Sequence, residues 1–144
     1  MPIRPENLHR YPTDWKHIRA HIIARARNRC EKCGLKNGTI GGRTSDGVFL
    51  PAIPDQHMYG LRWPKPGTTA YCAGAAGNMH ERLKIIQIVL TIAHLDHQPE
   101  NCADDNLLAL CQRCHLTYDA KHHAQTRYRT AREPKAIADL FDQS

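Results

Sequence analysis

The chain has 144 residues, of which 41% are hydrophobic, so it is long enough for one domain with a modest core and too apolar for wholesale disorder. It contains no run of 18 uncharged apolar residues, and no transmembrane helix is expected. Nine glycines, nine prolines and an aromatic fraction of 6% predict a small, loop-rich core. Such a core usually needs disulfides or a structural metal for stability, and the six cysteines could provide either.

Basic residues are concentrated at the two ends of the chain. Lys and Arg outnumber Asp and Glu by 20 to 14 overall, by nine to three within residues 1–36, and by five to one within residues 121–135. Two basic flanks around a central region suit a polyanionic partner such as DNA, bound through its backbone phosphates. A solvated basic surface without a partner would have the same composition.

The first twelve residues contain three prolines and predict an extended arm. They include no apolar stretch that could serve as a signal peptide, so we expect the protein in the cytoplasm. In that reducing compartment, closely spaced cysteines favour metal binding over disulfides.

Residues 15–29 predict an amphipathic helix with Thr13 as its N-cap. Apolar residues recur there at helical spacing, and basic residues lie between them. Either this helix only packs on the hydrophobic core, or its arginines also bind the phosphates of a nucleic acid. The apolar positions are Trp15, Ile18, Ile22 and Ala26, and the basic ones are Lys16, Arg19, Arg25 and Arg27.

Cys30 and Cys33 follow this helix in a Cys-x-x-Cys pair, with Gly34 directly behind. Two thiolates at this spacing can bind one tetrahedral Zn²⁺ from a tight knuckle, and glycine supplies the left-handed backbone that such a turn requires. Residues 35–84 are rich in Gly and Pro, and we interpret them as an insertion within one zinc-bound unit. A short strand is expected at 48–50.

Three other residues of the insertion can be explained by packing in the hydrophobic core. Tyr59 and Trp63 either cover the core or stack on a ligand. Cys72, among small residues, is expected to be a buried thiol and not a ligand.

The run 84–97 is apolar and β-branched, which predicts one buried strand. After a loop, Cys111 and Cys114 open a helix predicted at 112–126. His115 and Asp119 are four residues apart and therefore share a face of that helix. Beyond it we expect a basic tail, residues 127–144, that includes Arg127 and Arg129 and ends in a short helix starting at Pro134.

The two Cys-x-x-Cys pairs together predict a closed, structural zinc site. Its ligands would be Cys30, Cys33, Cys111 and Cys114. Two disulfides or four inert thiols are the competing interpretations. A structural site of this kind would explain stability, but it gives no role to the histidines and acids nearby.

Those remaining residues carry a family resemblance. The pattern Asp96-His97-x-Pro99, then Asn106-Leu107, then Leu110-Cys-x-x-Cys-His115 resembles the HNH endonuclease motif in its zinc-stapled form. The resemblance covers residues 30–33 and about 88–120. It implies an α+β protein with a small treble-clef-like ββα-metal core, decorated by an N-terminal helix and a loop-rich insertion. Residues 13–126 would then form a single nuclease domain.

The resemblance also implies roles for residues of this chain. His97 matches the general base, Asn106 the residue that holds the connecting loop and orients the base, and Asp96 and His115 two ligands of a catalytic ion. Asp119 stands where some members place a third ligand, and His94 is a second-sphere partner or a ligand in its place. The connection between His97 and Asn106 is shorter than is common in the family.

The chemistry fits these residue types, since a histidine can deprotonate water near neutral pH and one divalent cation can stabilise the developing charge on a phosphodiester. The mixed N/O ligand set fits Mg²⁺, Mn²⁺, Ni²⁺ or Zn²⁺ equally. Each residue also has an ordinary alternative, such as a turn cap for Asp96, a backbone-bonded strand end for His97, or an ion pair with Arg113 for Asp119.

The sequence therefore predicts a metal-dependent DNA endonuclease in a bacterial or phage-infected host cytoplasm, with no small-molecule cofactor and no membrane partner. Its phosphate contacts would come from the basic helix, from Arg113 and from the basic tail. The rival hypothesis is a non-catalytic zinc-binding module of the same fold that binds DNA or acts as an adaptor.

Overall fold

The fold mixes helices with antiparallel strands, in agreement with the expected α+β class. The computed structural model describes residues 3–74 and 80–141. The helices are η1 (Pro5–Arg10), α1 (Trp15–Arg25), η2 (Asp104–Asn106) and α2 (Gln112–Phe141). The strands are β1 (Ile40–Arg43), β2 (Phe49–Pro51), β3 (Asp55–His57), β4 (Gly60–Arg62), β5 (Thr69–Ala73), β6 (His80–Gln87), β7 (Leu90–His94) and β8 (Leu107–Cys111).

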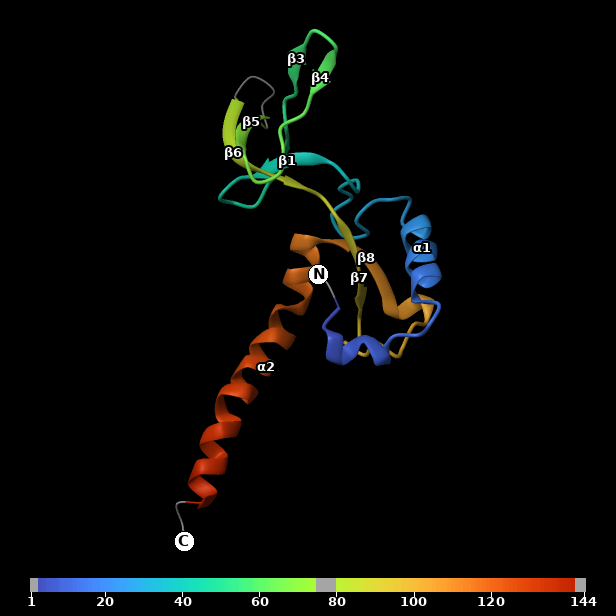
Figure 1. The fold of residues 1–144 in the computed structure, drawn as a ribbon, viewed down its shortest axis with the longest axis vertical. Helices are drawn as coiled ribbons and strands as arrows, with labels where there is room; N and C mark the ends of the chain where they lie inside the picture. The colour runs from blue at the N-terminus through green and yellow to red at the C-terminus, as the bar shows by residue number, and fades with distance from the viewer. Residues whose placement is uncertain (1–2, 75–79, 142–144) are drawn as a thin grey trace.

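The main core lies around the two-stranded sheet of β7 and β8, which pair antiparallel from Leu90–Cys111 to His94–Leu107. The side chains of both strands are largely buried. Helix α1 covers one side of the sheet, and α2 follows β8 directly, so its first turns pack against the same cluster (Figure 1). Ile22 of α1 is fully buried in this cluster. The hairpin and the two helices therefore position the segment between β7 and β8, where Asp96, His97 and Asn106 lie.

The N-terminal region differs from the prediction in three details. Part of the expected extended arm is a 3₁₀ helix, Pro5–Arg10. Asp14, rather than Thr13, occupies the N-cap position of α1. The helix ends at Arg25 instead of residue 29, because Arg27 and Asn28 adopt positive φ angles of 54° and 58° that a right-handed helix does not allow.

The insertion contains more regular structure than its prolines suggested. Strands β2-β1-β6-β5 form a four-stranded sheet in that order, and β3 pairs with β4 in a separate hairpin that projects at the far end of the molecule (Figure 1). This sheet has its own small core, made by Leu50, Ala52, Cys72 and Ile85. Cys72 is fully buried, as predicted.

Of the two alternatives for Tyr59 and Trp63, covering the core is contradicted, because these residues are 90% and 48% exposed. Both lie on or beside the projecting β3–β4 hairpin, away from the two hydrophobic clusters.

The single strand predicted at 84–97 is in fact two strands that belong to different sheets. Between β6 and β7 the chain crosses over at Ile88, whose N–H donates to the Thr39 carbonyl and whose own carbonyl accepts from Gly38 N–H. Ile88 is fully buried, and the sequence stays apolar across the crossover. The hydrophobic pattern therefore gives no sign that β6 ends and β7 begins there.

Helix α2 continues to Phe141, so the separate tail and the new helix at Pro134 are wrong. No glycine interrupts residues 112–133, and the Arg, Ala, Gln and Lys residues among them favour a continuous helix. The helix extends away from the rest of the fold (Figure 1). None of the helices within residues 3–74 and 80–141 has the length and apolarity needed to span a membrane.

Candidate functional site

The first half of the cysteine site is a knuckle directly after α1. Gly34 has φ = +78°, and its N–H donates to the Cys30 carbonyl at 2.8 Å, which closes the tight turn that the sequence predicted. The Cys33 N–H points at the Cys30 sulfur at 3.5 Å. Glu31 ties the knuckle to β8, since its N–H donates to the Ala109 carbonyl and its carboxylate accepts from the Ala109 N–H.

The second half comes from the end of β8 and the first turn of α2. Cys111 is the last residue of β8, and Cys114 lies three residues on, in α2. Together with the knuckle pair, their four sulfur atoms lie within 4.8 Å of one another. The predicted grouping of four cysteines is therefore confirmed, and all four are free thiols.

The spacing of the sulfur atoms suits a tetrahedral metal. Zn–S bonds of about 2.3 Å place neighbouring sulfur atoms about 3.8 Å apart in a regular tetrahedron. Sγ of Cys33 and Sγ of Cys111 are 3.7 Å apart, far beyond the length of a disulfide, about 2.05 Å. These cysteines form a site that can hold a structural metal such as zinc.

The surroundings favour the thiolate of Cys30, whereas burial raises the pKa of Cys33 and of Cys114. Burial opposes ionisation of Cys30, but backbone N–H groups of Cys111, Cys33 and Lys32 outweigh it and lower the pKa of Cys30 to about 7. Arg43 of β1 also directs its guanidinium at the Cys111 sulfur, at 3.8 Å. The insertion therefore contributes one positive charge beside the four sulfur atoms.

A second cluster of ligand-type side chains gathers around Asp119, on the first half of α2. Its Oδ2 lies 3.0 Å from Nε2 of His115, one helical turn earlier, and its Oδ1 lies 3.3 Å from Nδ1 of His97. Nε2 of His123 lies 3.9 Å from Oδ2. Asp119 is buried, with 9% of its surface exposed, so this carboxylate serves the histidines rather than solvent. Its partners are these histidines and not Arg113, which donates to the Gly47 carbonyl.

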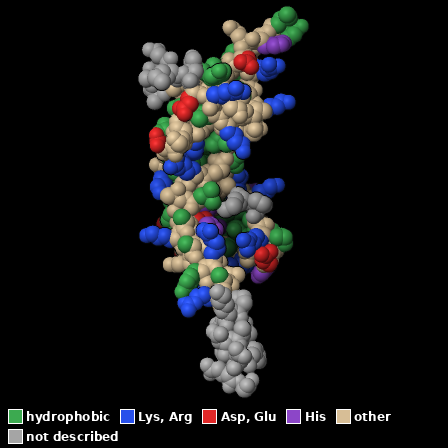
Figure 2. Space-filling view, turned by 90° about the vertical axis from the view of Figure 1, so that its left-hand side faces the viewer, with side chains coloured by type: hydrophobic (Ala, Val, Ile, Leu, Met, Phe, Trp, Pro, Cys, Tyr) green, Lys and Arg blue, Asp and Glu red, His purple; other side chains and the backbone are tan. Residues whose placement is uncertain are grey.

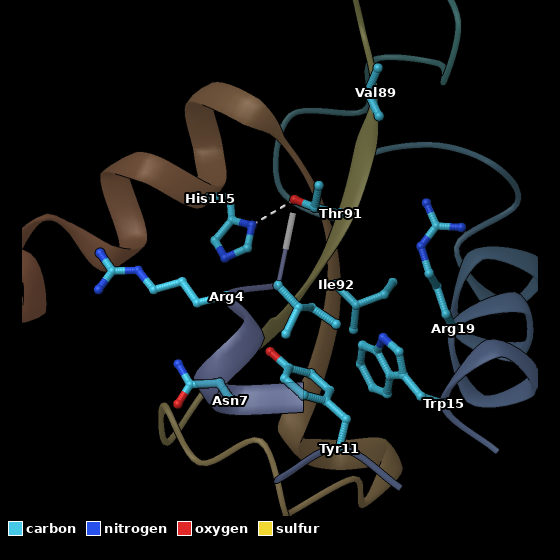
Figure 3. A pocket seen from close by; sticks show the side chains of 10 residues that line it. Arg4, Asn7, Tyr11, Trp15, Arg19, Val89, Thr91, Ile92 and His115 are labelled. Carbon is cyan, nitrogen blue, oxygen red and sulfur yellow. Dashed lines mark hydrogen bonds between the residues drawn. The ribbon is translucent and has the colours of Figure 1, made fainter. Parts of the chain in front are cut away.

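Both nitrogens of His115 have partners. Its Nδ1 lies 2.6 Å from the Thr91 hydroxyl (Figure 3), and its Nε2 faces Asp119. Burial lowers the pKa of His115, against the opposing effect of the Asp119 carboxylate. The ring is thus fixed between β7 and the helix, and the lowered pKa favours the neutral imidazole that metal ligands require.

His97 is held in an unusual conformation in the loop after β7. Its φ is +58°, in the left-handed region that is uncommon for residues other than glycine. Its ring stacks on His122 with 4.2 Å between centroids and on Tyr118 with 5.5 Å. Tyr118 in turn donates its hydroxyl to the Leu95 carbonyl. Side chains of α2 therefore fix both the backbone and the ring of this loop.

Asp96 and Asn106 form a separate network at the base of the same loop. Asn106 Nδ2 donates to Asp96 Oδ1 at 2.9 Å, and the Asp96 N–H donates back to Asn106 Oδ1 at 3.1 Å. Asn101 Nδ2 and the Gln98 N–H also donate to the carboxylate. The side-chain amides of Asn101 and Asn106, and then the Gln98 N–H, lower the pKa of Asp96 to about 2. Asn106 therefore fastens the loop through Asp96, without touching the His97 ring.

His94 is the last residue of β7 and is buried. Its ring stacks on Trp15 of α1, with centroids 5.2 Å apart, and its Nε2 lies 3.8 Å from the Cys102 sulfur. Burial lowers the pKa of His94, against the opposing effect of the Asp96 charge.

One cavity brings four of the predicted residues together. A pocket of about 300 Å³ is lined by His94, His97, His115 and Asp119, together with residues of η1 and the α2 histidines His122 and His123. Asp96 and Asn106 are not part of its lining. Within the described ranges, the four cysteines are nevertheless the only His, Cys, Asp or Glu group of three or more whose ligand atoms all lie within 4.8 Å of one another.

The basic residues named from the sequence divide into two groups. Arg25 is occupied within the protein, because it pairs with the Glu31 carboxylate and donates to the carbonyls of Asp104 and Leu107. Arg113 is similarly bound to Gly47, and Arg19 uses one nitrogen on the Leu90 carbonyl. All seven are at exposed positions, and the side chains of the other four have no hydrogen bond or ion pair among the described residues: Lys16, Arg27, Arg127 and Arg129. On the face seen in Figure 2, Lys and Arg side chains are spread along the length of the molecule.

Sequence reasoning missed His122, His123 and Thr91. His123 follows Asp119 by four residues, so the same helical spacing that singled out His115 could have identified it. His122 follows Asp119 by three residues, which is also a helical spacing. Thr91 carries no such signal, since it lies on β7 and meets His115 only through the tertiary fold.

Comparison with known proteins adds no identification. No protein-family model, no curated protein and no solved structure matches the chain. The site is therefore interpreted from its own residues and geometry.

Proposed function

We propose that this protein is a metal-dependent DNA endonuclease of the HNH type. The observation that carries the proposal is the grouping of His97, His115 and Asp119 beside a β-hairpin that runs directly into a helix. In this proposal β7, β8 and the start of α2 form the ββα-metal unit, and the four cysteines hold its helix and hairpin together in a treble-clef-like arrangement.

His97 is the general base that removes a proton from the attacking water. In this proposal the Asp119 carboxylate, whose Oδ1 lies 3.3 Å from Nδ1 of His97, favours the tautomer with its proton on Nδ1 and leaves Nε2 to accept a proton from water. Stacking between Tyr118 and His122 limits rotation of the ring. Asp119 and the two aromatic neighbours thus hold the base in one orientation.

His115 and Asp119 are the residues that would hold the catalytic cation. They supply one nitrogen and one oxygen from adjacent turns of a helix, which fits Mg²⁺, Mn²⁺, Ni²⁺ or Zn²⁺. The cation would supply stabilisation of the charge that develops on the phosphate and on the leaving 3′ oxygen. His94 lines the same cavity, whereas Asp96 would have to release one of its amide partners to join the set.

Exposed Lys and Arg side chains would bind the phosphates of DNA, giving an affinity that depends steeply on salt and weakly on sequence. Arg25 has no part in this proposed interface, because its guanidinium is already bound to Glu31 and to two backbone carbonyls.

The test is nicking of supercoiled plasmid with added Mg²⁺, Mn²⁺ or Ni²⁺, comparing the wild type with His97→Ala. We expect nicking by the wild type and a loss of at least about 100-fold in the variant, the usual contribution of a general base. His57→Ala, on the distant β3–β4 hairpin, is the matched control. DNA retention without nicking under any of these metals would instead support the non-catalytic zinc module.

A further inference from the structure

A second cavity lies beside the His–Asp cluster and has no role in the proposed chemistry. Its volume is about 570 Å³, within the range of about 300 to 1,000 Å³ typical of small-molecule sites. It is formed by the N-terminal arm, α1 and β7, and His115 closes it on the side of α2 (Figure 3). Asn7, Tyr11, Ile92 and His115 line both this cavity and the smaller one, so the two adjoin.

The lining of the larger cavity suits a ligand that is both planar and anionic. Tyr11 and Trp15 contribute two aromatic rings, and no Asp or Glu takes part. Arg4 from the arm and Arg19 from α1 lie on opposite sides of it (Figure 3). Aromatic faces stack on nucleobases, and guanidinium groups bind phosphate oxygens.

Specific contacts hold the N-terminal arm, which lines one side of this cavity, against the rest of the protein. Arg10 donates from Nε and Nη2 to the Glu100 carboxylate at 2.6 and 3.1 Å, and it reaches Gln98 as well. Tyr11, directly after Arg10, packs its ring edge-on against Trp15 with centroids 5.2 Å apart. The cavity is therefore built by specific contacts between the arm and the loop that carries Pro99 and Glu100.

We propose that this cavity binds one unpaired nucleotide of a DNA strand, next to the phosphate presented to His97, His115 and Asp119. The inference rests on the proposed nuclease function and names its substrate class. A base inside a duplex is stacked on both faces, so it can occupy a cavity of this kind only after leaving the helix. Single-stranded or distorted DNA provides such a base at lower cost, and the protein favours these substrates over intact duplex.

Trp15 provides a direct probe of this site. In a Trp63→Phe background, Trp15 is the only remaining tryptophan, since the chain has two. The zinc-loaded protein is titrated with short oligo(dT), without added divalent metal, and Trp15 fluorescence is followed. We expect saturable quenching by oligo(dT) and at least about 10-fold weaker quenching by a blunt DNA hairpin whose bases are all paired.

Tyr11→Ala should weaken oligo(dT) binding by about 5- to 100-fold, the range expected from the loss of one base stack. Tyr59→Ala removes a tyrosine that is 90% exposed on the distant hairpin, and it should leave binding unchanged. Tyr11→Phe keeps the ring and should keep the affinity within about twofold. Arg4→Ala, at an exposed position of the arm, should weaken binding without affecting the fold.

The inference is overturned if saturating oligo(dT) leaves Trp15 fluorescence unchanged, if Tyr11→Ala behaves like Tyr59→Ala, or if paired DNA quenches equally well. These outcomes are independent of catalysis, because the titration involves no turnover. Plasmid nicking without oligo(dT) quenching would overturn only this inference, whereas quenching without nicking would overturn only the proposed nuclease function.

Discussion

Cys33 and Cys111 are 78 positions apart in the chain, yet their sulfur atoms lie 3.7 Å from each other. One residue lies on the knuckle after α1 and the other at the end of β8, so a metal between them links the N-terminal helix to the strand that leads into α2. This link spans the whole insertion. With a metal bound, the cysteine site would join the two ends of the main core across the insertion.

Cys30→Ser should reduce the zinc content from about one ion per chain to nearly none. Structural zinc in small domains contributes about 10 kcal/mol or more of apparent binding free energy, so the thermal midpoint should fall by more than about 10 °C. Zinc is measured by elemental analysis and unfolding by circular dichroism. Cys72→Ser is the matched control, because Cys72 is equally buried but lies in the other hydrophobic cluster. Unchanged zinc in Cys30→Ser would reject the site.

Arg25→Ala should destabilise the fold without changing the salt dependence of DNA binding. The change leaves the partly buried Glu31 carboxylate and two backbone carbonyls without their donor, at a cost of about 1–3 kcal/mol. Urea denaturation measures this cost. Lys16→Ala, on the same helix, removes a side chain without a hydrogen bond or ion pair among the described residues, and it should alter stability by less than about 0.5 kcal/mol.

The DNA affinities of the same two variants provide a separate comparison. If Lys16 contacts a phosphate, its removal lowers the slope of log K against log salt by about 0.9. Arg25→Ala should keep the wild-type slope. A reversed pattern would place Arg25 in the DNA interface and contradict its assignment to the fold.

His94 should make the protein less stable as the pH falls below neutrality. Burial lowers the pKa of His94 in the folded state, so the unfolded chain binds the proton at higher pH than the folded protein does. Stability is therefore complete above the ordinary value of about 6.5, and it decreases as the pH falls from there toward the folded pKa.

His94→Phe keeps an aromatic ring against Trp15 but cannot bind a proton. Between pH 7.5 and 5.5, roughly the window around the ordinary histidine pKa, its unfolding free energy should depend on pH less steeply than the wild type's, by up to about 1.4 kcal/mol per pH unit. Urea titrations at several pH values measure the difference. Equal slopes for the wild type and His94→Phe would contradict the assignment.

The parts of the fold that could be predicted from sequence depend on short-range geometry. The knuckle turn, the helix-face pair of His115 and Asp119 and the buried face of α1 follow from spacing within a few residues. Joining two Cys-x-x-Cys pairs is a longer inference, but it rests on the coordination preference of zinc and not on the path of the chain.

The failures concern tertiary structure. The buried crossover at Ile88 is as apolar as the strands on either side, so periodicity gives no sign that β6 and β7 separate. The proline-rich insertion forms a sheet because β6 runs past the predicted bound at residue 84, so that its first half pairs with β5 and its second half with β1. The position of Asp96 depends on the conformation of a loop, in which Asn101 donates to its Oδ2 and Asn106 to its Oδ1. Local sequence does not show that the loop brings both amides to this one carboxylate.

Asn106 should act as a positioning residue for the loop that carries His97. Its side chain bonds to the Asp96 carboxylate, to the Asp96 N–H and to the Asn101 carbonyl, and its own carbonyl accepts from the Leu95 N–H. Asn106→Ala removes the three side-chain bonds and leaves the left-handed backbone at His97 without this support. We expect kcat for plasmid nicking to fall by about 10- to 100-fold with KM nearly unchanged, because the cavity residues that would meet DNA are retained.

Asn101→Ala is the matched control for this effect. It removes one donor to Asp96 but leaves Asn106 and its four contacts in place, so the loss in kcat should be several-fold smaller. A purely structural role for Asn106 would lower stability while leaving the kcat of the folded fraction unchanged. Oligo(dT) quenching of Trp15 in Asn106→Ala checks that the neighbouring cavity is intact. A large rise in KM with constant kcat would show that Asn106 supports DNA binding instead of the orientation of His97.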